Sequence, residues 1–325
     1  MKIVTLGSSG FLSGEVVRSA LRRGHQVVAV SRGHGAPAPT GAVEVHADRD
    51  DPDALARVLS GSAPDAVVDV CGYTVAGAQA AAGILGDVGA YAYVSSVSAY
   101  RAWPPGPVRG EGDPLFTPQD DLTSYGPMKA ESERVLGRVL GDRLWTVRPG
   151  LIIGPGDTTR RMTSWLHRIA TREQVAVPGT LDQPMAFVDV RDLAELLVTG
   201  VEQGWSGPVT ATGPVGMTTF GGLLEACREA VASTGGTPGT LVPIAEDRLL
   251  AAGVEPWRDL PFWLPHEVAR TAWDVDTTLA RSLGLAVRPV QDSVTDTWRW
   301  VQQRGLDHPE LDPRLEPSAL SAAAR

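Results

Sequence analysis

Tyr125 and Lys129 are spaced so that they could share one chemical task. They lie four residues apart in a segment, 125–140, that has the pattern of a helix, so their side chains project from one face, one turn apart. A tyrosine has a pKa of about 10, and shifting it to pH 7 takes about 4 kcal/mol. A nearby ammonium supplies part of that energy by stabilising the phenolate. The pair predicts an acid–base centre, with an ordinary helical pair as the alternative.

A hydroxyl-rich run, 95–100, follows an apolar segment, 90–95, that has the pattern of a strand. Ser96 in this run could hydrogen-bond the carbonyl or alkoxide oxygen of a substrate while Tyr125 gives or takes a proton. Proton transfer of this kind complements hydride transfer by a nicotinamide. We therefore expect Ser96, Tyr125 and Lys129 to be catalytic.

The elements that would position a nicotinamide begin at the N-terminus. Residues 3–6 form a short apolar run typical of a buried parallel strand, and residues 15–23 have the pattern of a helix. Between them lies a glycine-rich loop whose N–H groups, with the helix dipole, would hold a diphosphate. Ser13 stands where the spacing asks for a third glycine, and a plain β–α turn is the alternative. The predicted contacts of this loop are Gly7, Ser9, Gly10, Phe11 and Leu12.

Further strand patterns at 26–31, 43–46 and 66–70 alternate with helix patterns, which predicts a Rossmann-type doubly wound parallel sheet of the α/β class. In such a sheet the carboxyl ends of the strands border the ligand crevice. Ser31 and Arg32 end the second strand, and an arginine suits a 2′-phosphate where NAD sites usually have an acidic residue. NADP(H) is therefore favoured, with NAD(H) as the alternative.

The strand at 66–70 ends in residues that we expect at the same crevice. Val70, Cys71 and Gly72 are predicted to contact cofactor, and Tyr73 to contact substrate. Cys71 has no histidine or lysine near it in sequence, so a packed side chain is favoured over a nucleophile.

Composition restricts the partners. The 325 residues carry a formal net charge of −9 without a basic cluster, which argues against nucleic acid and favours a small-molecule substrate. No run of eighteen apolar residues occurs and the chain enters a strand at once, so we expect no membrane span, no signal peptide and a cytoplasmic location. The two cysteines give no disulfide framework, and the six histidines lack metal-ligand spacing, so no metal is expected.

From Met1 to about Arg304, on the glycine loop, the Ser-rich strand end and the Tyr-x-x-x-Lys helix, the chain resembles the extended short-chain dehydrogenases of the NAD-dependent epimerase/dehydratase family. The resemblance implies that Ser96, Tyr125 and Lys129 match the catalytic Ser/Thr, Tyr and Lys. It also implies that Asp48 is the acid that contacts the adenine and that Arg49 beside it is a cofactor contact. Residues 148–157 would lie near the nicotinamide. The cofactor contacts implied there are Pro149, Leu151 and Ile152.

Departures from the family pattern bear on the substrate. Nucleotide-sugar members commonly place an arginine just ahead of the strand-to-helix element that matches residues 186–194, whereas this chain has Gln183, Pro184 and Met185. This weakens a sugar-diphosphate substrate, and the closer likeness is to reductase-like members. A related branch includes RNA-binding proteins, but the acidic charge and the intact Ser, Tyr and Lys argue against that function.

The expected organisation is a cofactor domain at 1–155, a smaller substrate-binding α/β subdomain at 156–308 with some return to the core near 187–202, and a flexible tail at 309–325. Segment 255–265 is dense in aromatic residues and prolines, which favours either a substrate wall or ordinary packing. Expected helices there are 162–171, 192–202, 220–232, 276–284 and 294–303. The full set of substrate contacts is Tyr73, Ser98, Arg160, Trp165, Trp257 and Trp263.

Three functions remain open from sequence. The first is an NADP(H)-dependent reductase or dehydrogenase acting on a small, fairly apolar metabolite. The second is an epimerase or dehydratase that retains its cofactor through turnover. The third is a non-catalytic protein that binds a dinucleotide as a signal. The resemblance also suggests a homodimer through helices 76–85 and 125–140.

Overall fold

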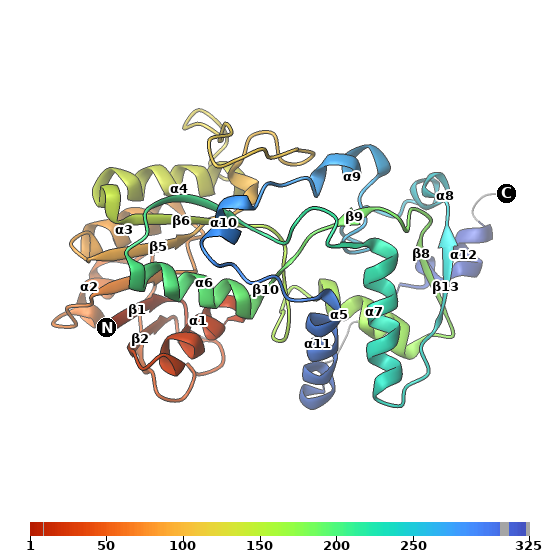
Figure 1. The fold of residues 1–325 in the computed structure, drawn as a ribbon, viewed down its shortest axis with the longest axis horizontal. Helices are drawn as coiled ribbons and strands as arrows, with labels where there is room; N and C mark the ends of the chain where they lie inside the picture. The colour runs from red at the N-terminus through yellow and green to blue at the C-terminus, as the bar shows by residue number, and fades with distance from the viewer. Residues whose placement is uncertain (9, 306–311, 323–325) are drawn as a thin grey trace. The chain divides into compact units, whose positions relative to one another are not determined.

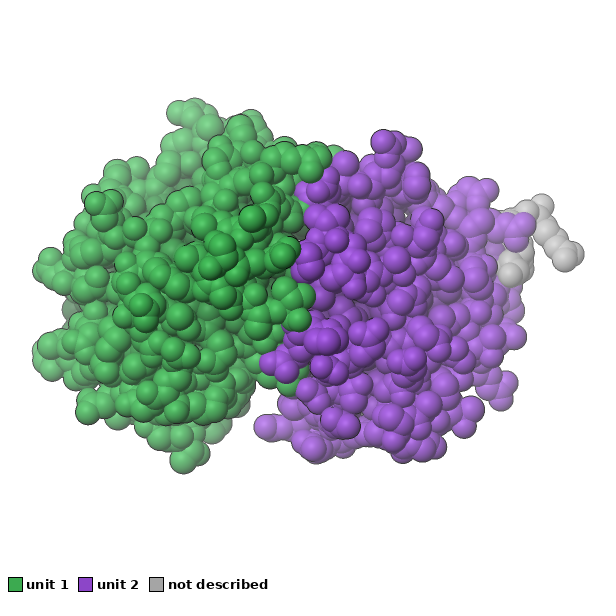
Figure 2. All heavy atoms as spheres, in the orientation of Figure 1, with its two compact units in different colours: residues 1–152, 188–213, 275–287 green, residues 153–187, 214–274, 288–325 purple. Residues whose placement is uncertain are grey.

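The computed structural model describes residues 1–8, 10–305 and 312–322. The chain divides into two compact units, each built from separated stretches of sequence (Figure 2). Unit 1 comprises Met1–Ile152, Val188–Gly213 and Val275–Val287, and unit 2 comprises Ile153–Phe187, Pro214–Asp274 and Arg288–Arg325. The chain passes from one unit to the other near two short strands, β7 (Ile152–Ile153) and β10 (Val188–Asp189).

A seven-stranded sheet forms the centre of unit 1, with all neighbouring strands parallel and in the order β11-β6-β5-β4-β1-β2-β3. The order reverses between β1 and β4, so the loops after these strands diverge at one edge, where α/β sheets bind ligands. The predicted doubly wound Rossmann-type fold is confirmed. The strands are β1 (Lys2–Leu6), β2 (Gln26–Ser31), β3 (Val43–His46), β4 (Ala66–Asp69), β5 (Ala90–Val94), β6 (Leu144–Pro149) and β11 (Gly207–Ala211).

Helices cover both faces of the sheet (Figure 1). Successive strand residues point to opposite faces, so Ile3 packs in the core with α1 (Phe11–Arg22) and α6 (Val190–Gln203), whereas Val4 packs in the core on the other face. That second core includes α2 (Pro52–Leu59), α3 (Val75–Leu85) and α4 (Tyr125–Leu140). Near the end of unit 1 lies α10 (Thr278–Ser282), shorter than the helix predicted at 276–284.

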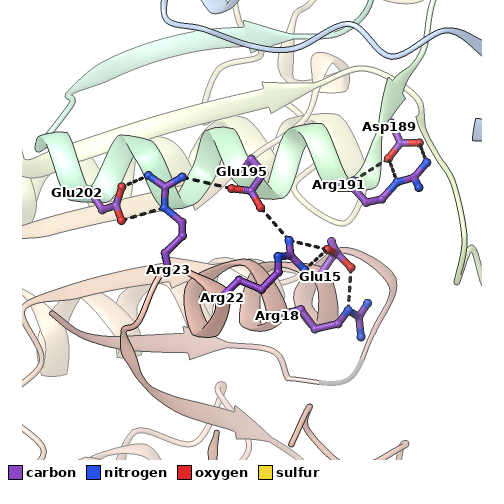
Figure 3. A network of polar contacts seen from close by, with 8 residues as sticks. All are labelled: Glu15, Arg18, Arg22, Arg23, Asp189, Arg191, Glu195 and Glu202. Atoms are coloured by element: carbon purple, nitrogen blue, oxygen red, sulfur yellow. Dashed lines mark hydrogen bonds and ion pairs between the residues drawn. The ribbon is translucent and has the colours of Figure 1, made fainter. Parts of the chain in front are cut away.

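Helices α1 and α6 are also joined by an ionic network (Figure 3). Arg22 Nη2 lies 2.8 Å from a carboxylate oxygen of Glu195 and 3.1 Å from one of Glu15. Arg23 pairs with Glu195 and Glu202. The network fixes the helix that follows the glycine loop against a second helix of the same face.

Unit 2 contains two small sheets and several helices. β8 (Gln174–Pro178) pairs in parallel with β13 (Thr240–Ile244), and β9 (Pro184–Met185) pairs antiparallel with β12 (Thr218–Thr219). The helices are α5 (Arg161–Thr171), α7 (Phe220–Ser233), α8 (Glu246–Ala251), α9 (His266–Ala272) and α11 (Val290–Arg304), which begins four residues before its predicted start. Among the described residues, no helix is both long and apolar enough to cross a membrane.

The C-terminal segment differs from the expected flexible tail. The described part, from residue 312, forms a 3-10 helix at Pro313–Leu315 and α12 (Pro317–Ala322), while residues 309–311 and 323–325 lie outside the described residues. Leu315 and Leu320 are buried, and Glu316 pairs with Arg172 at 3.3 Å. Burial of these two leucines offsets the polar composition that predicted disorder.

Candidate active site at the carboxyl edge of the sheet

The glycine loop has the local geometry that an anion site requires. Gly7 has a φ of +99°, and a Cβ at this position would lie 3.2 Å from the Cβ of Ser13. The Gly10 N–H donates to the Ser13 hydroxyl at 3.0 Å, so the serine in place of the third glycine holds the first turn of α1. The hydroxyl of Ser8 is buried without a partner among the described residues. An unpaired hydroxyl beside the N-terminus of a twelve-residue helix fits a diphosphate.

Two predicted loop contacts, Phe11 and Leu12, occupy the first turn of α1, where backbone N–H groups have no intrahelical acceptor. Ser9, also predicted to contact the cofactor, lies outside the described residues. These positions remain predictions for cofactor contact.

The end of β2 presents an exposed cation. Arg32 is exposed and has no ion-pair partner among the described residues. Ser31 beside it donates to Glu44 at 3.1 Å and accepts from the Gly33 N–H at 3.2 Å. His46 lies next to Gly33, where a Cβ would approach the imidazole Nδ1 to 3.1 Å. Glu44 and His46 carry no local signal in the sequence, because only the β2–β3 register brings them beside Ser31 and Arg32.

The ends of β3 and β4 are tied together by a buried ion pair. Asp48 is exposed, but the guanidinium of Arg49 turns inward and pairs with Asp69, which also accepts from the Tyr91 hydroxyl at 2.8 Å. The Arg49 side chain is occupied inside the unit, and the predicted contact of this residue with the cofactor stays a prediction. Burial, with a contribution from Asp69, raises the pKa of Cys71 to about 12, which agrees with a packed thiol.

Lys129 lies at the centre of the remaining predicted residues. Its Nζ is buried, donates to the Val94 carbonyl at 2.9 Å, and lies 5.2, 5.1 and 5.7 Å from the ring centroids of Tyr73, Tyr93 and Tyr125. Burial lowers the pKa of Lys129 to about 8, against an opposing contribution from the Asp69 carboxylate. The predicted lysine and tyrosine are thus brought together, with two further tyrosine rings around the same ammonium.

Ser96 and Tyr125 come from elements that touch. The Ser96 hydroxyl accepts from the Ser98 N–H at 3.1 Å at the start of a 3-10 helix, Val97–Ala99. Gly126, next to Tyr125, packs so closely on this helix that an added Cβ would overlap the Ser98 carbonyl oxygen. This contact sets the 3-10 helix that follows Ser96 against the first turn of α4.

One buried network near the centre was missed from sequence. The Ser95 hydroxyl donates to Glu133, and the same carboxylate accepts from Arg148 on β6. Glu133 follows Lys129 by four residues, and this helical spacing was the available signal. Beyond Arg148, Pro149 is buried at the end of β6, whereas Leu151 and Ile152, the first residue of β7, are half-buried.

Unit 2 contains the other predicted substrate residues, in two kinds of environment. Arg160 is exposed at the N-terminus of α5, and Trp257 is half-buried with its ring 5.3 Å from the Arg161 guanidinium. Trp165 and Trp263 are 0% and 1% exposed, and the Trp165 indole donates to the Pro261 carbonyl at 2.8 Å. For Trp263 this burial is the ordinary packing that sequence offered as the alternative for segment 255–265.

This arrangement can place a phenol, an ammonium and a hydroxyl beside a dinucleotide. The comparisons with known proteins identify the family. Residues 3–85 and 74–211 match the model of the NAD dependent epimerase/dehydratase family. A 2′-dehydrokanamycin reductase from Streptomyces kanamyceticus is 30% identical over 129 residues, a match that spans 39% of this chain and only 34% of the reductase.

Solved structures with the same fold cover nearly the whole chain. The enzyme WbmH of Bordetella bronchiseptica, in complex with NAD+, has a TM-score of 0.72 at 16% identity and covers 94% of this chain and 99% of its own. The UDP-glucose 4-epimerase of Thermotoga maritima, with UDP-glucose, has a TM-score of 0.68 at 17% identity, with coverages of 94% and 100%. At these identities the likeness establishes the fold.

Proposed function

Because the chain belongs to the NAD dependent epimerase/dehydratase family, we propose that it is an NADP(H)-dependent reductase or dehydrogenase acting on a carbonyl or alcohol of a small metabolite. The observation that carries the proposal is the exposed Tyr125 phenol beside the buried Lys129 ammonium. The enzyme is of the extended short-chain dehydrogenase type, and we propose that it acts in the cytoplasm and that two copies associate.

Two groups support NADP(H) over NAD(H). Arg32 is exposed directly after β2, where a 2′-phosphate would need a cation, and the carboxylate of Glu44 is already occupied by Ser31 and by the Ala38 N–H. A 2′-phosphate would therefore meet a cation at this strand end, whereas the carboxylate of Glu44 on the neighbouring strand is already engaged.

In this proposal Tyr125 is the group that gives or takes the proton. A nicotinamide, when bound, supplies or accepts the hydride. Lys129 stabilises the phenolate of Tyr125 electrostatically, in a site where burial strengthens the interaction. Ser96 donates to the substrate oxygen on which negative charge develops.

The reductase direction is supported by the curated relative, whose name describes a reductase. Gln183 argues against a sugar diphosphate, because its side chain is buried, neutral and donates to the Phe262 carbonyl at 3.3 Å. A substrate with a ketone or a secondary alcohol and little anionic charge suits these residues best.

Binding titrations of NADPH and NADH test the proposal, each with the wild type, Arg32→Asp and a control, Arg57→Asp, at an exposed arginine of α2. We expect NADPH to bind the wild type at least tenfold tighter than NADH, a difference of about 1.4 kcal/mol, and only Arg32→Asp to erase it. NADPH oxidation with a panel of small ketones then measures turnover. A tightly held dinucleotide that never exchanges would favour the epimerase or dehydratase, and absence of binding would favour neither enzyme.

A further inference from the structure

Two of the five tyrosines are exposed, and both lie beside the same buried cation. Tyr91, Tyr93 and Tyr100 are fully buried, whereas Tyr73 is 65% and Tyr125 is 47% exposed. Their ring centroids lie 5.2 and 5.7 Å from the Nζ of Lys129. Tyr125 transfers the proton in the proposed chemistry. Tyr73, predicted from sequence to contact substrate, has no part in that transfer, although its ring lies as close to the ammonium.

The backbone on either side of Tyr73 is fixed. A Cβ at Gly72 would lie 2.5 Å from the Tyr93 ring, and the Gly72 carbonyl accepts from the Tyr93 hydroxyl at 3.4 Å. On the other side, the Thr74 hydroxyl accepts from the Gly77 N–H at 2.9 Å and so caps α3. Tyr73 is therefore an exposed side chain on a fixed support, which is how a residue is held when its position matters.

We propose that Tyr73 is a positioning residue of the reaction centre, whose ring covers the Lys129 ammonium and separates it from solvent. Lys129 is 2% exposed, and Tyr73 is the exposed ring over it that the proton transfer does not use. Water exclusion matters because an ammonium acts more strongly on a neighbouring phenolate when solvent does not screen it. The consequence for catalysis rests on the proposed function, whereas the shielding itself does not.

The charged groups that face Lys129 are already paired with one another, so shielding from solvent is the main variable that can change the pKa of Lys129. Asp69 on β4 is paired with Arg49 from the loop after β3. Glu133, on the same helix as Lys129, is paired with Arg148 from β6.

Among the described residues, a thiol and two phenol rings also face this ammonium. Burial keeps the Cys71 thiol after β4 neutral by raising its pKa to about 12. Tyr93 on β5 and Tyr125 on α4 contribute their rings. Burial is the largest influence on the pKa of Lys129. Exposing the ammonium to solvent should therefore change this pKa more than losing the electrostatic attraction of one ring.

Three substitutions at Tyr73 separate shielding from the ring's attraction, because losing the one raises the pKa of Lys129 and losing the other lowers it. Tyr73→Ala admits water, favours the charged form, and should raise the pKa of Lys129 from about 8 toward 10.5. Tyr73→Leu keeps the cover but loses the ring's attraction for a cation, so it should lower this pKa by less than about one pH unit. Tyr73→Phe keeps both and should leave the titration of Lys129 unchanged.

The chain offers a clean measurement because Lys2 and Lys129 are its two lysines. NMR of protein labelled with 13C at the lysine Cε follows both, and Lys2→Arg assigns the Lys129 signal. The proposal is supported if Tyr73→Ala and Tyr73→Leu move the Lys129 titration in opposite directions. It is overturned if Tyr73→Ala leaves the titration where the wild type has it, with melting temperature confirming that the variant is folded. The readout needs neither cofactor nor substrate, so failure of the proposed reductase activity would show separately.

Discussion

Arg148 and Glu133 form a two-point ion pair inside unit 1, with Nε and Nη2 donating to the two carboxylate oxygens at 3.0 and 2.7 Å. Both side chains are buried. The same guanidinium donates to the Tyr100 hydroxyl at 3.0 Å, and the Ser95 hydroxyl donates to Glu133. The pair therefore ties β6 and the end of β5 to the helix that carries Lys129.

Glu133→Gln should destabilise the protein strongly. The substitution keeps the shape of the side chain but leaves the buried Arg148 guanidinium without its counter-charge. Removing one partner of a buried pair typically costs about 3 kcal/mol or more, because the remaining charge stays desolvated. Urea unfolding monitored by circular dichroism measures the loss.

Glu195→Gln on α6 is the matched control for that substitution. Glu195 also accepts from arginines, Arg22 and Arg23, but its side chain is 42% exposed (Figure 3). Exposed pairs contribute less than about 1 kcal/mol and weaken in salt. If both substitutions lower the free energy of unfolding equally, the buried Arg148–Glu133 pair contributes no more to stability than an exposed pair does.

Gly126→Ala should disturb the contact that sets Ser98 against the first turn of α4. The new Cβ would overlap the Ser98 carbonyl oxygen and lie 3.0 Å from the Phe116 ring. Because a backbone oxygen cannot move aside alone, we expect a loss of about 1–3 kcal/mol of unfolding free energy, together with reduced turnover.

Gly137→Ala, on the same helix, separates this clash from the general effect of alanine. At Gly137 the nearest atom is 3.9 Å from an added Cβ, an ordinary contact. Alanine there should stabilise the helix by about 0.5–1 kcal/mol. Thermal unfolding of the two variants should therefore shift in opposite directions, and a parallel shift would contradict the packing argument.

Local patterns were sufficient to predict most of unit 1. The strands at 26–31 and 43–46 and the helix at 125–140 have the predicted bounds, because apolar runs, glycine stops and an early Pro127 act within a few residues. The C-terminal helix after 312 was missed, since its stability comes from burying Leu315 and Leu320 in distant parts of unit 2. Burial of that kind has no local signal.

The predicted site likewise contains features that have a local sequence signal and features that depend on distant parts of the chain. Tyr125 and Lys129 could be paired from helical spacing alone, and the structure brings them together. The inward turn of Arg49 toward Asp69 joins the ends of β3 and β4, which are not neighbours in the sheet, so it could not be read from either segment. The cofactor contacts assigned at the other strand ends stay predictions.

Tyr125→Phe should lower kcat at least 100-fold, because the phenol is the group that transfers the proton and phenylalanine cannot. The Kd for NADPH should stay within about threefold of the wild type, since the ring that contacts the Lys129 ammonium remains. Turnover and binding measured on one preparation, with melting temperature as the control for folding, check this. Unchanged function in the variant would instead support a protein that binds the dinucleotide without catalysis.

Lys129→Met should change how stability depends on pH. The pKa of Lys129 falls from 10.5 to about 8 on folding, so between these values the unfolded chain binds a proton that the folded protein does not, and the lysine's contribution to stability rises with pH. Below pH 8 both states are protonated and burial of the charge costs about 3 kcal/mol, which methionine avoids. We therefore expect the stability of Lys129→Met relative to the wild type to be greatest at pH 7 and to shrink toward pH 10. Urea unfolding of both proteins at several pH values measures the difference in stability. The buried tyrosines and cysteines are present in both proteins, so their contributions cancel in this difference. A difference that stays constant with pH would show that Lys129 does not titrate below its ordinary range.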